Sequence, residues 1–211
     1  NAFGNFRNLL MDVTLSPMMG LYLDMANNDK PNPLNGVTPN ENYARELMEL
    51  HTLGVNGGYT EKDVKQAALL LTGWETPWDT GVTRYVPSRH YTKPVRIMGR
   101  TITNGTGDAG KIAQQRFVRW LAMHPSTANH ICRKLAIRFV SDNPSPALVK
   151  ALAATYLRNR TSIAPVLRQL FASAEFASSG SLKMRRPFER IVAVVRTLDA
   201  KYTGDKEGLM Q

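Results

Sequence analysis

The sequence predicts a mainly α-helical protein, a single-domain multi-helix bundle with a small β-hairpin excursion at about residues 82–102. Three observations lead to this prediction. Apolar residues recur at helical spacing through most of the 211 residues. Several helical segments open on a residue that is followed by proline, as helix starts do. Only residues 75–109 combine Thr, Gly, Pro and aromatic residues in short alternating stretches typical of strands.

The helices are bounded by capping signals as well as by periodicity. Ser145-Pro146 and Arg186-Pro187 each resemble a cap followed by a first-turn proline. Gly54 suits the position just after a helix, and Thr60 with Asp63 resembles a capping box. In chain order, helices are predicted over residues 3–13, 16–23, 41–53, 61–71, 110–123, 126–140, 146–157, 163–172 and 187–200.

Two segments between these helices follow other patterns. Residues 25–39 are rich in Asn, Pro, Gly and Asp, which predicts a long polar loop. The stretches TRYVPSRHY (83–91) and PVRIMGRTI (94–102) alternate in polarity and predict two short strands that form one hairpin. We therefore expect one helical domain over residues 1–211, with a polar motif at 40–74 and a hairpin region at 75–109 in its first half.

Positive charge is concentrated in the second half of the chain. Residues 1–109 hold 10 Lys and Arg against 11 Asp and Glu, whereas residues 110–211 hold 17 against 6. Such asymmetry indicates an anionic partner, which could be a nucleic acid, an acidic glycan, a membrane surface or another protein. A set of solvated helix faces is the alternative. Because the basic residues are spread over several helices without a recognised DNA-binding motif, nucleic acid is the less favoured partner.

Several classes of protein are excluded or disfavoured by simple counts. No run approaches the roughly 18 apolar residues that a transmembrane helix needs. The start, NAFGNFRNLLMD, lacks a signal peptide's features, and both ends are abrupt, so we expect a fragment of a longer chain. Cys132 is the only cysteine, which rules out an intramolecular disulfide, and its apolar-periodic setting predicts a buried core residue.

The segment most suggestive of chemistry is the helix predicted after Asn40. Asn42, Glu46 and Glu49 are three or four residues apart and share one face, with Arg45 beside them. The two carboxylates and the guanidinium could form a buried ion-pair network. They could equally provide general acid and base groups, if burial separates the pKa values of the two carboxyls.

A metal site is only weakly indicated, and no cofactor is predicted. Helical di-metal sites use Glu-x-x-His, which brings both ligands to one face. His51 follows Glu49 by two residues, so in an α-helix the two side chains diverge. There is also no Gly-x-Ser-x-Gly elbow and no Rossmann fingerprint.

The long motif NENYARELMELHTLGVNGGYTEKDV…LTGW (40–74) resembles the hallmark of the bacterial domain-of-unknown-function 1800 family. The resemblance continues through RHYTKPVRIMGRTI, with His90, Lys93 (one residue closer than in the family pattern) and Gly99, and through HPSTANHICRKLAIRFVSDNP and LRQLFASAEF. It implies a mostly helical, exported bacterial protein, periplasmic or on the cell surface, that is often encoded beside a sulfatase-like partner. It implies no established activity.

Together these observations predict a polar pocket around residues 40–63 that binds a partner protein or an anionic glycan. The alternatives are a hydrolase-like or metal-assisted enzyme that uses Glu46 and Glu49 as acid/base groups or ligands, and a purely structural module. His51 is a further catalytic candidate. The predicted binding residues are Asn40, Asn42, Arg45, Tyr59, Trp74, His90, Lys93, Arg185 and Arg186.

Overall fold

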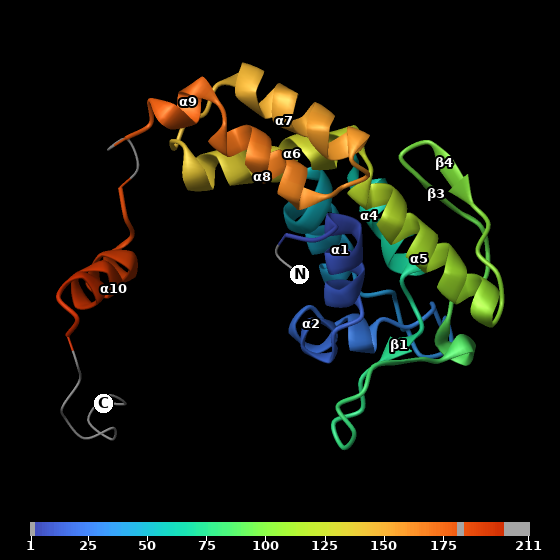
Figure 1. The fold of residues 1–211 in the computed structure, drawn as a ribbon. Helices are drawn as coiled ribbons and strands as arrows, with labels where there is room; N and C mark the ends of the chain where they lie inside the picture. Colours follow the sequence, from blue (N-terminus) through green and yellow to red (C-terminus); the bar gives the residue numbers. More distant parts are fainter. Residues whose placement is uncertain (1–2, 181–183, 201–211) are drawn as a thin grey trace.

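The computed structural model describes residues 3–180 and 184–200, and its fold is mainly α-helical, as the sequence predicts (Figure 1). The α-helices are α1 Phe6–Thr14, α2 Pro17–Tyr22, α3 Asn42–Glu46, α4 Glu61–Leu70, α5 Asp108–Ala122, α6 Pro125–Phe139, α7 Pro146–Arg158, α8 Ile163–Phe171, α9 Ala174–Ala177 and α10 Pro187–Thr197. The short helical turns are η1 Met25–Asn27 and η3 Pro87–Arg89. Most predicted helices are confirmed to within two residues at each end, while α9 was not predicted.

The helix predicted over residues 41–53 changes its geometry halfway along. α3 runs directly into a π-helix, η2 Leu47–Leu53. The Thr52 hydroxyl donates to the Leu47 carbonyl five residues back, at 2.6 Å. Gly54 ends the helix with a φ of 84°, and a Cβ there would lie 2.8 Å from Nδ1 of His130. The π-helix matters because its wider turn, with hydrogen bonds between residues five apart, brings such residues closer to the same side than an α-helix does.

The single predicted hairpin is instead two, one on each side of η3. Strand β1 Trp74–Glu75 pairs antiparallel with β2 Arg84–Tyr85, and β3 Val95–Ile97 pairs with β4 Arg100–Ile102. Met98 and Gly99 both have positive φ, so they form the tight two-residue turn that right-twisted strands favour. This turn closes β3 on β4 locally, and β2 therefore pairs with the earlier segment after α4.

Two clusters of buried side chains organise the fold. One lies among α1, α3, η2, α4 and α5, and the other lies within the α6–α8 layer at the top of Figure 1. Phe6 packs against both clusters, and the Tyr156 hydroxyl donates to the Ala122 carbonyl at 2.8 Å between them. Cys132 is buried in the second cluster, as predicted, and burial raises its thiol pKa to about 12.

Helix α10 stands apart from the other helices (Figure 1), and none of its residues is buried. Its Glu189 forms an ion pair with Arg138 of α6 at 2.6 Å. Among the described residues, no helix is both long enough and apolar enough to cross a bilayer.

Candidate functional site

Arg45 is paired with carboxylates other than those first considered for it. Its guanidinium donates to both carboxylate oxygens of Glu61 at 2.6 and 2.7 Å, and to Glu41 at 3.2 Å. The hydrogen bonds with Glu61 raise the pKa of Arg45 and lower the pKa of the Glu61 carboxyl. Since Glu61 begins α4, this pair ties α3 to α4 at the surface.

Asn40 and Asn42, two of the predicted binding residues, form hydrogen bonds within the turn that leads into α3. The Asn40 side-chain oxygen accepts from the Asn42 backbone N–H at 2.9 Å, and the Asn42 amide donates to Asp24 at 2.9 Å. The Asn40 N–H in turn donates to the side chain of Asn28 at 2.9 Å. Both amides have partners within the chain, and their hydrogen bonds fix the start of α3. We call α3 together with η2 the motif helix.

The π-helix creates a pair that the sequence did not predict. Glu46 and His51 are five residues apart, and the Glu46 carboxylate lies near enough to raise the pKa of His51 against the larger lowering caused by burial. Oε2 of Glu46 and Nδ1 of His51 are both buried without a hydrogen-bond partner. Glu49 is placed differently, accepting from the Tyr59 hydroxyl at 3.4 Å. The acid/base candidates thus separate into a Glu46–His51 pair and a Glu49–Tyr59 pair.

His90 is a buried structural centre, 1% exposed, and its neighbours do not come from the motif helix. Its Nε2 donates to the side-chain oxygen of Asn104 at 2.7 Å, because the Asn104 amide nitrogen itself donates to the Tyr91 carbonyl. Its Nδ1 lies 2.9 Å from the Thr72 carbonyl. Gln114 of α5 donates to the same carbonyl at 3.0 Å.

We call Thr72, His90, Asn104 and Gln114 the polar clamp. Gln114 also accepts from the Trp74 indole, so the Thr-Gly-Trp end of α4 is bound directly to α5. Trp74 is 5% exposed, and its indole is therefore a core group that cannot serve as an open binding face. Asn104 and Gln114 escaped sequence analysis because amides in a loop and in a helix carry no pattern of their own.

Two further residues close the polar clamp. At Gly110 of α5, an added Cβ would lie 2.5 Å from the His90 ring and 2.6 Å from the Tyr85 hydroxyl. The Tyr85 ring lies beside the His90 ring in a tilted contact with centroids 5.6 Å apart, and the Tyr85 hydroxyl is buried without a partner. Burial raises the pKa of Tyr85 to about 12. A glycine at position 110 is what allows α5 to approach the histidine this closely.

The neighbouring face of α5 borders an open pocket of about 530 Å³ that β4 also lines. Successive turns of α5 supply its wall, and β4 with the following loop supplies its rim. Phe117 and Trp120 stack at its base, with ring centroids 6.0 Å apart. The lining residues are Arg100, Thr101, Ile102, Thr103, Gly105, Ala109, Ile112, Ala113, Arg116, Phe117 and Trp120.

Two arginines give this aromatic-based pocket its charge. The Arg100 guanidinium lies 5.2 Å from the centroid of the Trp120 ring, over its face. Arg116, one turn before Trp120 on α5, lines the same pocket and is exposed. We call the residues Arg100, Arg116, Phe117 and Trp120 the aromatic–arginine pocket. Sequence reasoning missed it because its two arginines lie on a strand and a helix brought together only by the fold.

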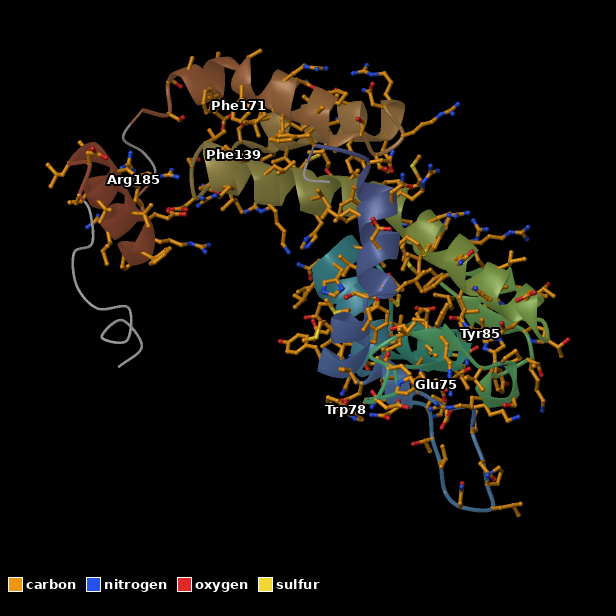
Figure 2. All side chains as sticks on the ribbon, turned by 60° about the horizontal axis from the view of Figure 1, so that its bottom comes forward. Glu75, Trp78, Tyr85, Phe139, Phe171 and Arg185 are labelled. Carbon is orange, nitrogen blue, oxygen red and sulfur yellow. The ribbon has the colours of Figure 1, made fainter. Side chains whose placement is uncertain are left out.

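The remaining predicted residues lie elsewhere. Lys93 is exposed at the loop before β3. Arg185 and Arg186 are exposed at the start of α10 and line a groove facing α6. Trp78 is 86% exposed at the tip of the β1–β2 hairpin, at the edge of the molecule in Figure 2. Within residues 3–180 and 184–200, no three His, Cys, Asp or Glu side chains are grouped so that they could hold a metal ion.

Comparison with known proteins gives one match. Residues 1–210 match the model of the family described as Protein of unknown function (DUF1800). No curated protein and no solved structure matches the chain. The match covers the motif helix, the polar clamp and the aromatic–arginine pocket.

Gly110→Ala is expected to destabilise the protein by about 1–3 kcal/mol, because the new methyl group would collide with His90. Alanine normally stabilises a helix relative to glycine by about 0.5–1 kcal/mol, so the sign is reversed. Urea unfolding gives the comparison. Gly180→Ala, with open space at its Cβ position, serves as the control and should change little.

A double-mutant cycle identifies the cause of that effect. In a His90→Ala background, the collision with the histidine ring is removed and only the contact with the Tyr85 hydroxyl remains, so the cost of Gly110→Ala should fall. His90→Ala alone should cost about 2–4 kcal/mol, because it leaves a cavity and unpaired acceptors. An equal cost of Gly110→Ala in both backgrounds would contradict the described packing.

Glu46→Gln is expected to lower the pKa of His51 further, because it removes the carboxylate that favours the imidazolium. Lys134→Gln should raise the pKa, since the ammonium acts in the opposite direction. NMR titration of the His51 ring protons measures both shifts. Unchanged titration in Glu46→Gln would show that the two side chains are not coupled.

The same shift has a consequence for stability. Because the pKa of His51 in the folded state lies below the ordinary value of 6.5, the unfolded chain binds a proton first as the pH falls. The contribution of His51 is therefore present above about pH 6.5 and is lost as the pH falls towards its folded pKa. Glu46→Gln should steepen this loss in urea unfolding between pH 7 and 5.

Proposed function

The chain belongs to the DUF1800 family, whose function is unknown, and we propose that it is a binding module for an acidic sugar of an anionic glycan. The observation that carries the proposal is the aromatic–arginine pocket, where two exposed guanidinium groups stand over an apolar base. Export, a bacterial source and a sulfatase-like partner, which the family resemblance implies, stay predictions.

The size and lining of the pocket suit one sugar unit. Its volume of about 530 Å³ lies within the range of about 300–1,000 Å³ typical of small-molecule sites. Ile112 is 44% exposed beside Trp120, so an apolar surface is available to the C–H face of a sugar ring. The open side leaves room for the neighbouring units of a polymer.

The way Arg100 is held favours an oxyanion as its ligand. Its guanidinium carbon lies over the Trp120 ring, and no carboxylate of the described residues forms an ion pair with it, so its N–H groups are available to a ligand. Arg116 adds a second fork that matches a carboxylate or a sulfate. A net charge of +10 would also draw a polyanion towards the protein.

A second candidate function, acid/base chemistry by Glu46 with His51, is favoured by one specific observation. Each residue has a buried polar atom without a hydrogen-bond partner, with Glu46 just before the π-helix and His51 within it, and π-helical turns are often found at functional sites. Cleavage of a bound oligosaccharide that is lost in Glu46→Gln, with binding retained, would support this function.

The binding proposal is tested by titrating the protein with a heparin hexasaccharide and with an oligogalacturonate, following heat or tryptophan fluorescence. Arg100→Ala with Arg116→Ala should weaken binding at least about tenfold, as the loss of two charge-assisted contacts implies. Neutral cellohexaose should not bind. Preference between the two probes distinguishes a sulfate from a carboxylate ligand.

Matched variants separate a site from general charge attraction. Arg119→Ala removes an exposed arginine of the same helix that does not line the pocket, and Trp78→Ala removes an exposed tryptophan elsewhere. Both should bind like the wild type. If Arg119→Ala together with Lys150→Ala weakens binding as much as the two pocket replacements, the proposal is wrong.

A further inference from the structure

Helix α10 presents an apolar stripe that nothing in the described chain covers. Phe188, Ile191 and Leu198 are 74%, 61% and 71% exposed, and Val194 and Val195 are 56% and 44% exposed. Their spacing of three and four residues places them on one face of the helix. Such a stripe on a surface helix normally packs against another element.

The length of α10 makes this exposure more informative. It has 11 residues, and isolated helices shorter than about 12–15 residues are marginal in water. Pro187 in the first turn, and the Glu189 side chain accepting from the Arg186 N–H at 3.1 Å, help the helix to start. Most helical stability comes from packing of the apolar face, so α10 is expected to gain its stability from a partner.

A groove of about 1,190 Å³ lies between α10 and α6. This exceeds the usual range of small-molecule pockets and suits a peptide segment. Its apolar surface is provided by Ile137, Phe139, Met184, Phe188, Val192 and Ala193. Phe139 also contacts Phe171 edge-on, with ring centroids 5.3 Å apart, at the end of the α6–α8 layer that faces α10 (Figure 2).

The rim of the groove has a clear excess of positive charge. Its basic residues outnumber its acidic ones, five against two, and one of the acids, Glu189, is paired with Arg138. The other acid, Asp142, is not free of partners either. The basic residues are Lys134, Arg138, Arg185, Arg186 and Arg196. The excess includes Arg185 and Arg186, which the sequence already indicated as binding residues for an anion.

We propose that this groove binds an acidic amphipathic helix of a partner protein. The apolar face of the partner helix would pack against Phe188, the one stripe residue that lines the groove, together with Val192 and Phe139. Its Asp and Glu side chains would pair with the rim arginines. A second copy presenting the same surface would bring like charges together. A flat bilayer would not fill a concave groove, although it would satisfy an exposed basic amphipathic helix.

The test uses the whole chain and a synthetic amphipathic helix of about 18 residues, with Leu on one face and Glu on the other. Fluorescence anisotropy should give a Kd below about 100 μM, and hydrogen exchange of the α10 amides should slow in the complex. A peptide with every Glu replaced by Lys is the control for charge and should not bind.

Variants of the protein locate the binding surface. Arg185→Glu with Arg186→Glu should weaken peptide binding at least about tenfold, because both reversals repel the acidic face. Arg119→Glu with Lys150→Glu makes the same charge change at exposed positions outside the groove and should have a much smaller effect. Circular dichroism confirms that both double variants are folded.

Each other outcome would overturn the proposal. Equal weakening by the two double variants would indicate general charge attraction. Binding to phosphatidylserine vesicles but not to the peptide would assign α10 to a membrane surface. A dimer whose α10 amides are protected without peptide would assign the stripe to a second copy. Binding of the heparin hexasaccharide that Arg185→Glu with Arg186→Glu abolishes, with no peptide binding, would assign the groove to a glycan.

Discussion

The rest of the fold depends on the polar clamp, in which the buried His90 side chain joins three segments distant in sequence. Its ring reaches the end of α4 through Thr72, the loop after β4 through Asn104, and α5 through Gln114. A buried polar group is costly unless it is hydrogen-bonded, so these contacts act as a set. They permit few other arrangements of the two hairpins against the helices. The clamp is thus a constraint on geometry as well as a source of stability.

That constraint explains how an open pocket can exist beside the core. One side of α5 carries Gly110 and Gln114 against the clamp, while Ile112 and Arg116 line the pocket beside β4. Asn104 fixes the loop that leaves β4, so the pocket rim is tied to the same histidine that holds the helix. The pocket is therefore preorganised by contacts on its far side. A binding site built in this way needs little rearrangement to accept a ligand.

The helices could be predicted well because hydrophobic periodicity and capping residues are local signals. The predicted capping box of Thr60 and Asp63, for example, is present at the start of α4. It failed on strand pairing, because the turn at Met98 and Gly99 decides which strand finds which partner. It also grouped Glu46 with Glu49 and Arg45 and did not pair it with His51, since 3.6-residue spacing does not anticipate a π-helix. Site residues such as Arg100 and Trp120 are adjacent only through tertiary contacts, which no window of sequence reveals.

The arginines of this protein differ in what surrounds the guanidinium, and that difference bears on function more than their number does. Arg45, Arg84 and Arg89 direct their N–H groups to carboxylates of the chain, and these hydrogen bonds join neighbouring elements. The guanidinium carbon of Arg100 instead lies over the Trp120 ring, a cation–π contact. No ion pair among the described residues engages Arg100, so its N–H donors are available to another molecule. Net charge alone does not locate an anionic partner, whereas an arginine that is not tied to a carboxylate of the chain marks the place where we propose that it binds.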